Sequence, residues 1–268
     1  MELQESLSEY ERNGIAVFAV SYDSVDVLRA FGEKYSIGYP LLADEGSAVI
    51  TRLGLRNDRL QEHHAFYGGS ARDDQWGVPY PGAFVLDEQG VVVEKRFEDS
   101  YRARETAVGI LEGAFKAQSA AHGAEATVSG PGIAVHAYLD SLTYRSMQRL
   151  RLTVDLDIEA GRHIYGLPIP DGYVPLSVEV EPIDGLIVGA MEAPDPHPFS
   201  VVGLDEQFQV YDGRVRLVLP LTFGLATADQ VVTATVRYQA CSATDCLPPT
   251  ALRLQLPVSV LNHVERPG

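Results

Sequence analysis

Several kinds of residue and segment are scarce in this chain. Only two of its 268 residues are cysteines, and no run of 18 or more apolar residues occurs, so we expect no membrane-spanning helix. Basic residues are also few, since 21 Lys and Arg stand against 37 Asp and Glu, a formal net charge of −16. So acidic a chain argues against nucleic acid and anionic membrane surfaces as partners.

The start of the chain lacks the features of a secretory leader. Residues 1–5 contain neither the basic region nor the apolar region of a signal peptide. Taken alone, this start predicts a cytoplasmic protein.

Both cysteines lie in one C-x4-C segment, Cys241 to Cys246. Before it, apolar and polar residues alternate over residues 231–240, and they alternate again over residues 252–256, as in half-buried strands. Pro248-Pro249 has no backbone donors and ends the loop stiffly. The pattern predicts a β-hairpin with two cysteines at its mouth, close enough to bridge if the loop folds back.

The cysteine pair has a small set of chemical interpretations. A zinc site needs about four ligands and the chain has no third cysteine, so we expect no metal and no cofactor. A structural disulfide is one alternative, although so short a loop stabilises by less than the ~3 kcal/mol of a 15-residue loop. A reactive dithiol on a rigid turn is the other. The spacing alone leaves both open.

The sequence around the cysteines resembles the amino-terminal domain of the thiol:disulfide interchange protein DsbD. The resemblance covers roughly residues 132–260, and its most specific part is Tyr238-Gln239-Ala240-Cys241 followed by Cys246-Leu247-Pro248-Pro249. Gly161–Gly166 and Asp205–Phe208 agree in order. The resemblance implies an immunoglobulin-like β-sandwich. In that family the cysteine pair takes electrons from a transmembrane partner and passes them to extracytoplasmic thioredoxin-like proteins.

The same resemblance implies roles for individual residues. Cys246 would form the intermolecular bond and Cys241 would resolve it, while Phe208 would be the lid over the pair. We expect Tyr238 and Gln239 to support the strand rather than to react.

The loop itself carries one further prediction about reactivity. It holds no lysine or arginine, and Asp245 lies beside Cys246. A neighbouring carboxylate raises the pKa of a thiol, so we expect a slow thiol that depends on partner docking.

The first 117 residues follow an α/β pattern. Helical spacing of Leu3, Leu7 and Tyr10 is followed by an apolar run at residues 15–20, which predicts a strand buried on both faces. A helix after Ser24, a strand pair at 83–86 and 91–97, and a helix at 107–115 complete a thioredoxin-like order.

These residues resemble the peroxiredoxin (AhpC/TSA-like) family at Tyr22-Asp23-Ser24, Tyr39–Asp44 and Pro81–Asp87. The resemblance implies a cis bond before Pro81, facing the active site. The family's first core strand and nucleophilic cysteine, however, would precede Leu3, and no cysteine occurs before Cys241. We therefore assign this region no catalytic residue, expect unpaired strand edges in its sheet, and infer a shortened amino terminus.

Two other features of this region are open to a functional interpretation. His63-His64 lack supporting ligands nearby, so we expect exposed loop histidines rather than a metal site. The stiff aromatic stretch Trp76–Pro81 is either the lip of a cleft or simple packing.

The predicted organisation has a redoxin/thioredoxin-like α/β domain at 1–117 and a linker at 118–131. An all-β immunoglobulin-like sandwich at 132–262 and a tail at 263–268 follow. The predicted function is a thiol–disulfide oxidoreductase or redox relay that exchanges electrons through Cys241 and Cys246 with a thioredoxin-fold partner. A membrane electron donor of the DsbD type is a further expected partner, without direct membrane insertion of this chain.

Two alternatives remain at this point. One is a non-catalytic sandwich with a structural disulfide, and the other is a truncated peroxiredoxin-type peroxidase. The resemblance implies a periplasmic location with a missing signal peptide, whereas a genuine start at Met1 implies the cytoplasm. The sequence identifies neither the electron donor and acceptor nor the oligomeric state.

Overall fold

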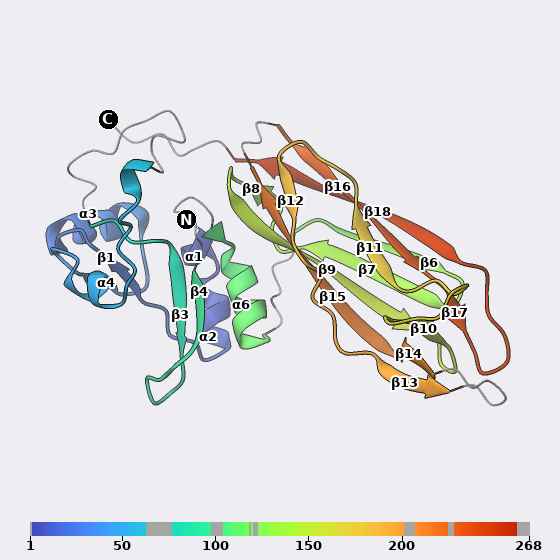
Figure 1. Ribbon diagram of the computed structural model, residues 1–268. Coiled ribbons are helices and arrows are strands. Elements are labelled where there is room, and N and C mark those ends of the chain that lie inside the picture. The colour runs from blue at the N-terminus through green and yellow to red at the C-terminus, as the bar shows by residue number, and fades with distance from the viewer. Residues whose placement is uncertain are drawn as a thin grey trace. The chain divides into compact units, whose positions relative to one another are not determined.

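The computed structural model describes residues 2–62, 77–97, 104–117, 119, 123–200, 207–224 and 228–261. The chain divides into two units, Met1–Ala120 and Ala121–Gly268, called below the N-terminal and the C-terminal unit. Each unit is described by itself (Figure 1).

The N-terminal unit is an α/β region. Its helices are α1 (Glu2–Glu5), α2 (Leu7–Arg12), α3 (Val25–Tyr35), α4 (Ala48–Arg52) and α6 (Ala107–Phe115). Its strands are β1 (Ala19–Ser21), β2 (Leu41–Ala43), β3 (Gly82–Leu86), β4 (Val92–Phe97) and β5 (Arg104–Glu105).

Local sequence signals determine where these helices begin and end. The Ser24 hydroxyl accepts a hydrogen bond from the Val27 amide at 3.4 Å and caps α3. Thr106 caps α6 in the same way through the Gly109 amide, at 2.8 Å. Helix α2 ends at Asn13, and Gly14 follows at φ 71°, a conformation that glycine adopts without steric cost.

The strands of the N-terminal unit form two separate pairs. Strand β1 pairs in parallel with β2, β3 pairs antiparallel with β4, and no hydrogen-bonded ladder joins the pairs within the described residues. The expected unpaired edges are therefore present. The prediction that the run 15–20 is buried on both faces is wrong, because β1 has one neighbour and leaves Phe18 61% and Val20 50% exposed.

The expected cis bond before Pro81 is also wrong. In the described part of the chain the cis peptide bond is Leu167–Pro168. Residues 78–80 run extended beside residues 55–57, with the Tyr80 amide donating to the Leu55 carbonyl at 2.7 Å. A trans bond continues this extended path into β3, and trans is the intrinsically favoured isomer.

The C-terminal unit is a β-sandwich. Its strands are β6 (Glu125–Gly130), β7 (Ile133–Leu139), β8 (Thr143–Tyr144), β9 (Gln148–Ile158), β10 (His163–Tyr165), β11 (Ser177–Val180), β12 (Leu186–Val188), β13 (His197–Ser200), β14 (Gln207–Tyr211), β15 (Arg214–Phe223), β16 (Gln230–Tyr238), β17 (Ala240–Cys241) and β18 (Thr250–Val260).

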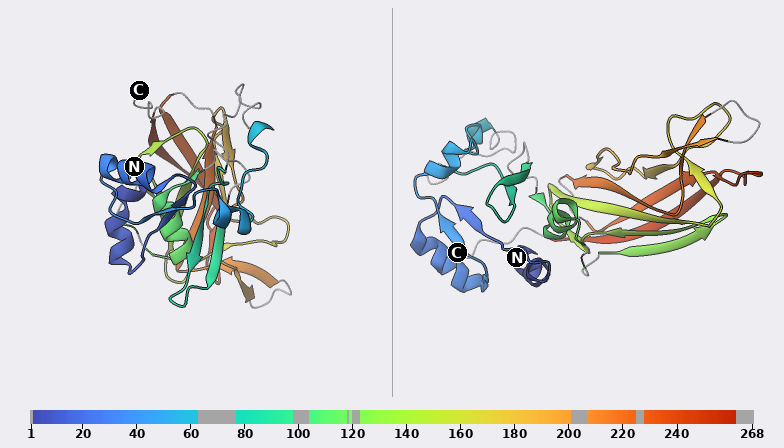
Figure 2. Two further views of the ribbon diagram at one scale, coloured as in Figure 1. Left: turned by 90° about the vertical axis from the view of Figure 1, so that its left-hand side faces the viewer. Right: turned by 90° about the horizontal axis from the view of Figure 1, so that it is seen from below.

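Two main sheets enclose the core of this unit. One runs in the order β12-β15-β9-β7-β6 and the other in the order β11-β16-β18-β8 (Figures 1 and 2). Alternate residues of the long strands point inward, so that Leu152 and Val154 of β9, Leu217 of β15 and Val236 of β16 are all fully buried. A smaller sheet, β13-β14-β10-β17, lies at one end of the sandwich and carries Cys241.

Part of the predicted linker belongs to this sandwich. Residues 125–130 form β6, which pairs with β7 from Glu125 opposite Tyr138 to Gly130 opposite Ile133. The small polar composition suggested a linker, but Ala126 and Val128 alternate with Thr127 and Ser129 as in a strand, and Pro131-Gly132 supplies the turn.

Three predicted features lie outside the described residues: His63-His64, Trp76 and the segment 204–206. Within the described part of the chain, no helix has the length and apolarity needed to cross a membrane.

Candidate functional site: the Cys241–Cys246 disulfide

Gln239 marks the point where the chain passes from one sheet to another. Strand β16 pairs with β18 up to Tyr238, and two residues later β17 pairs with β10 instead. The Gln239 side chain holds this change of direction, since its Oε1 accepts from the Val174 amide at 3.3 Å and its Nε2 donates to the Leu247 carbonyl at 3.2 Å. Gln239 thus supports the strand geometrically, as does Tyr238, which is 1% exposed and donates to the Pro131 carbonyl.

Cys241 and Cys246 form a disulfide across a tight hairpin. Their Cα atoms are 4.0 Å apart. On one side of the pair the Leu247 amide donates to the Ala240 carbonyl at 2.8 Å, and on the other the Ser242 amide donates to the Asp245 carbonyl at 2.7 Å. The bridge therefore joins a directly opposed pair of residues on a well-bonded turn.

The two cysteines differ sharply in accessibility. Cys241 is 0% exposed, whereas Cys246 is exposed to solvent. Cys241 packs in the cluster of the small sheet, so the two ends of the disulfide have different surroundings.

Aromatic side chains surround the buried side of the disulfide. The Tyr165 hydroxyl lies 3.7 Å from the Cys246 Sγ atom, and the Tyr165 ring packs against Tyr173 and Phe208 at centroid distances of 5.1 Å and 5.4 Å. His163 stacks on Phe199 at 4.2 Å and meets Tyr165 edge-on at 5.5 Å.

Sequence reasoning missed His163, Tyr165 and Phe199 as members of this site. A signal for the first two existed, because residues two apart on a strand share a face. Both lie in the segment Gly161–Gly166, which the resemblance to the DsbD family includes.

The expected lid residue occupies a core position. Phe208 is 0% exposed in β14, where it pairs with Phe199 of β13 and packs in one cluster with Tyr165, Val210 and Cys241. It therefore forms part of the wall of the site. Phe199, which is only partly buried, packs on the outside of the same cluster.

An ion pair lies beside the exposed cysteine. Arg162 Nη1 is 3.6 Å from Asp245 Oδ2, so the turn before β10 supplies a cation that the loop sequence lacks. The Ser242 hydroxyl donates to the Asp245 carboxylate, and this bond together with Arg162 lowers the pKa of Asp245. Asp245 is therefore an ionised carboxylate at neutral pH, and Arg162 offsets part of its charge.

Burial keeps the two titratable rings of the site neutral. It raises the pKa of the Tyr165 hydroxyl, with a further contribution from Tyr173. Burial also lowers the pKa of His163; His197 adds to this effect and Asp212 opposes it. At neutral pH both side chains can donate or accept a hydrogen bond without carrying charge.

Comparison with known proteins assigns each part of the chain to a recognised domain type. Residues 1–95 match the AhpC/TSA family, and residues 137–257 match the family described as thiol:disulfide interchange protein DsbD, N-terminal. The chain joins an AhpC/TSA redoxin region to a DsbD N-terminal-like domain.

Individual proteins that match this chain share low sequence identity with it. A putative peroxiredoxin bcp from Coxiella burnetii is 27% identical over 89 residues, which is 32% of this chain and 50% of that protein. This chain thus spans half the length of that relative.

Several solved structures are similar to the C-terminal part of this chain, including two whose names describe DsbD-type or periplasmic domains. The N-terminal periplasmic domain of ScsB from Proteus mirabilis has a TM-score of 0.37 and 19% identity, over 52% of this chain and 51% of that one. A complex between the DsbD N-terminal and PilB N-terminal domains from Neisseria meningitidis has a TM-score of 0.30 and 16% identity, over 39% and 73%.

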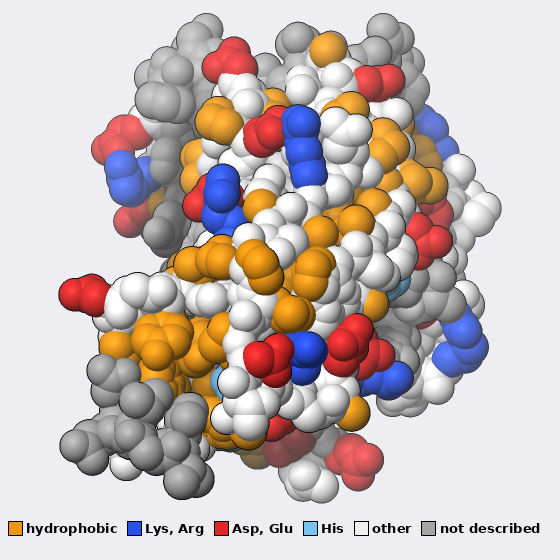
Figure 3. All heavy atoms as spheres, turned by 90° about the vertical axis from the view of Figure 1, so that its right-hand side faces the viewer, with side chains coloured by type: hydrophobic (Ala, Val, Ile, Leu, Met, Phe, Trp, Pro, Cys, Tyr) orange, Lys and Arg blue, Asp and Glu red, His pale blue; other side chains and the backbone are white. Residues whose placement is uncertain are grey.

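The end of the DsbD-like domain that carries the small sheet is partly apolar on its surface. Figure 3 views the molecule from this side and shows hydrophobic side chains gathered between acidic and basic ones. Close to the disulfide in sequence or strand order, the exposed apolar residues include Leu167, Pro198, Pro248 and Pro249.

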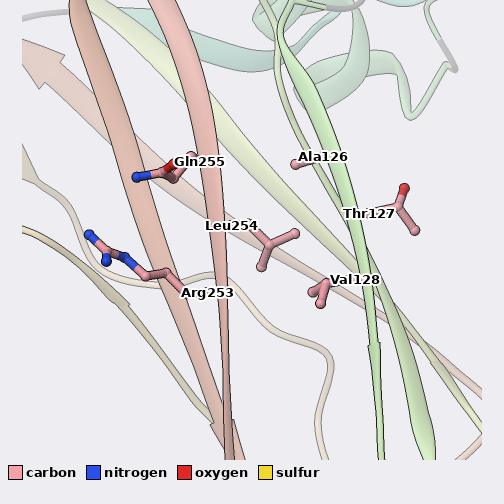
Figure 4. Close-up of a pocket in the computed structure, with 6 residues that line it drawn as sticks. All are labelled: Ala126, Thr127, Val128, Arg253, Leu254 and Gln255. Carbon is pink, nitrogen blue, oxygen red and sulfur yellow. The ribbon is translucent and has the colours of Figure 1, made fainter.

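A cavity in the DsbD-like domain lies between the edges of β6 and β18. It has a volume of about 260 Å³ and is lined by residues 126–128 and 253–255. Ala126, Val128 and Leu254 lie between the strands, while Arg253 and Gln255 point away (Figure 4). No cysteine, histidine or carboxylate lines it, so we assign it no chemistry. No metal-binding group of His, Cys, Asp and Glu occurs among the described residues.

Proposed function

We propose that this chain is a thiol–disulfide relay module that exchanges electrons through Cys241 and Cys246 with a thioredoxin-fold partner. The observation that carries the proposal is the unequal exposure of the two cysteine residues, Cys241 buried and Cys246 exposed, on a hydrogen-bonded turn. A bridge that only closes the hairpin does not require one of its cysteines to be exposed. A bridge across so short a loop also stabilises the fold little, because it removes little chain entropy from the unfolded state.

The surroundings of the disulfide support partner docking. The exposed Cys246 is followed directly by Leu247, Pro248 and Pro249, and Pro248 and Pro249 are themselves exposed. Apolar surface around a reactive sulfur favours a protein partner over a small hydrophilic thiol. The match of residues 137–257 to the DsbD N-terminal family favours a thioredoxin-like protein as that partner.

The proposed roles of the cysteines follow from their positions. Cys246 forms the mixed disulfide with the partner, and Cys241 resolves it from within the aromatic cluster. Tyr238 and Gln239 hold the strand, and Phe208 forms the wall. Since a bridge of this kind persists in an oxidising compartment, we further propose an extracytoplasmic location. Cell fractionation of the full-length gene product tests it, and recovery in the cytosol alone contradicts it.

Peroxidase activity is not part of the proposal. Both cysteines of the chain are in the C-terminal unit. Thiol peroxidases need a thiolate nucleophile, and the redoxin-like residues present here contain none.

Trapping of the mixed disulfide tests the division of roles. Cys241→Ser leaves the exposed sulfur and removes the resolving one, so incubation with a thioredoxin that carries a disulfide should accumulate a covalent adduct. Cys246→Ser leaves only the buried sulfur and should form at least ~100-fold less adduct, since reaction depends on thiolate access. Intact-mass spectrometry reads both.

The matched pair of variants makes the result decisive. Each loses the same bridge, so any loss of stability from opening the hairpin is shared. Equal trapping by both variants, or none by either, would overturn the proposed function.

A further inference from the structure

His163 faces the buried cysteine directly across a strand pair. In the antiparallel register of β10 and β17, His163 is opposite Cys241, while Ile164 is opposite Ala240. Directly opposed residues project to the same face with Cβ atoms about 4.5–5.5 Å apart. Ile164 and Ala240 belong to the main core, so His163 and Cys241 share the other face, toward the aromatic cluster.

The His163 ring is buried and incompletely bonded. The residue is 5% exposed, and its Nε2 atom has no hydrogen-bond partner among the described residues. A buried polar atom without a partner costs free energy, so such an atom next to a reactive group calls for an explanation. Here the neighbouring group is a disulfide, which has no proton to share while it is oxidised.

The charged groups around His163 do not supply that partner. Asp212, between β14 and β15, raises the pKa of His163, and His197 of β13 lowers it. These two groups are paired with each other at 3.3 Å. Tyr165, on the same strand as His163, and Phe199 of β13 contact the His163 ring with their own rings. Asp245 at the disulfide is held by Ser242 and Arg162.

We propose that His163 is the proton acceptor for Cys241 when the dithiol is oxidised. This inference rests on the relay function proposed above. It adds a second proton-bearing group to the site, beside the Tyr165 hydroxyl that contacts Cys246.

The step balances as follows. In the reduced protein, the Cys246 thiol gives its proton to solvent, and its thiolate attacks the partner's disulfide to form a mixed disulfide and release one partner thiolate. The Cys241 thiol then gives its proton to His163, and its Sγ attacks the Cys246 Sγ. The Cys241–Cys246 bond forms, the Cys246–partner bond breaks, and the second partner thiolate leaves. Two electrons pass to the partner, and His163 returns its proton to solvent.

In the reverse direction the same group acts as an acid. A partner thiolate attacks the exposed Cys246, and Cys241 leaves as a thiolate in a buried site. His163, which is neutral at rest, takes up a proton from solvent and passes it to this thiolate. A buried thiolate without a proton donor or cation is costly, which makes this the step that benefits.

The two thiol steps can be separated with 5,5′-dithiobis(2-nitrobenzoate), an aromatic disulfide that releases a coloured thiolate at each step. The full chain is reduced, desalted and mixed with this reagent in a stopped-flow instrument. The first equivalent of colour reports attack by Cys246, and the second reports resolution by Cys241. For His163→Gln we expect an unchanged first phase and a second phase slowed about 100-fold at pH 7, within the range of general base catalysis.

The pH profile distinguishes proton transfer from a loss of packing. In the unmodified protein the second phase should slow as pH falls through the pKa of His163, which burial holds below its ordinary value of about 6.5. In His163→Gln this inflection should disappear, leaving only the titration of the thiol. This readout in the unmodified protein also stands if the variant folds poorly.

His136→Gln is the matched control. His136 lies on β7 of the same domain, is in contact with Glu125 at 3.1 Å, and belongs to a different sheet from the one that carries Cys241. Both phases should be unchanged in it. A second phase in His163→Gln with the normal rate, or a profile of the unmodified protein without an inflection below 6.5, would overturn the role of His163 alone. Failure of the unmodified reduced protein to release the second equivalent would overturn the relay function as well.

Discussion

The two units of this chain bury their apolar strand residues to very different extents. In the DsbD-like domain, β9 lies between β15 and β7 and buries Leu152 and Val154 completely. In the redoxin-like region, β1 comes from the continuously apolar run 15–20, but within the described residues β2 is the one strand paired with it, and Phe18 and Val20 stay at least half exposed. An apolar run therefore predicts burial only where strands on both sides complete the sheet.

The units also differ in chemistry. The redoxin-like region contains no cysteine, whereas the sandwich holds both cysteines on one turn. The functional interpretation therefore belongs to the C-terminal unit.

The largest expected difference between the units concerns core truncation. Leu152→Ala in β9 should lower the free energy of unfolding of the sandwich by about 2–5 kcal/mol, because it leaves a cavity in a closed core. Leu42→Ala in β2, where the side chain is 46% exposed, should change stability by less than about 1 kcal/mol. Hydrogen–deuterium exchange of peptides from each strand measures both, and equal effects would contradict the comparison.

A smaller effect on the stability of each unit is expected when a buried tyrosine hydroxyl is removed. Tyr238 donates to the Pro131 carbonyl at 3.1 Å, and Tyr10 donates to the Ala107 carbonyl at 2.6 Å. Each Tyr→Phe change should cost its own unit about 1–3 kcal/mol, since an acceptor loses its donor.

Neither tyrosine variant should alter thiol exchange. Urea unfolding gives the stabilities, and colour release by the aromatic disulfide gives the exchange rates. Slower exchange in Tyr238→Phe would show that Tyr238 does more than hold the strand.

The sandwich should also lose stability in mild acid through His163. Its pKa is lowered in the folded state, so below about pH 6.5 the unfolded chain binds more protons than the folded one. The contribution is fully present above that pH and is lost as pH falls toward the folded pKa. The loss should be absent in His163→Gln, as measured by urea unfolding between pH 7.5 and 5. An identical pH dependence in the two proteins would contradict it.

The smallest expected effect concerns the charge beside Cys246. Asp245→Asn removes a carboxylate next to the exposed thiol, so the pKa of the thiol should fall. The alkylation rate of the reduced protein at pH 7 should then rise a few-fold, which corresponds to a free-energy change of ~1 kcal/mol or less. Asp184→Asn, on the exposed turn between β11 and β12, is the control. An unchanged rate in Asp245→Asn would mean that Arg162 already neutralises this charge at the sulfur.

Local patterns predicted most of the fold. Capping at Ser24, the stop at Asn13-Gly14 and the alternation in β9, β16 and β18 all depend on neighbours in sequence, and the structure confirms them. The strand β6 was missed because its small polar residues have the composition of a linker, and only its pairing with β7 reveals it.

Part of the site could also be predicted from residues that are neighbours in the sequence. The cysteine pair lies on one loop, so its hairpin could be inferred from flanking strands. Its surroundings come from β10, β13 and β14, between about 30 and 80 residues earlier in the chain. The positions of His163 and Phe199, and the pairing of Arg162 with Asp245, depend on sheet register that a single sequence does not specify.

The redox equilibrium of the Cys241–Cys246 pair tests the central claim most directly. The folded protein is equilibrated with glutathione or thioredoxin buffers, and the fraction reduced is read by thiol alkylation and mass spectrometry. A relay module should have a potential above the range of structural bridges, which lie below about −300 mV, and should be reduced without unfolding. A bridge that stays closed until the sandwich unfolds would contradict the relay and leave a stapled binding domain.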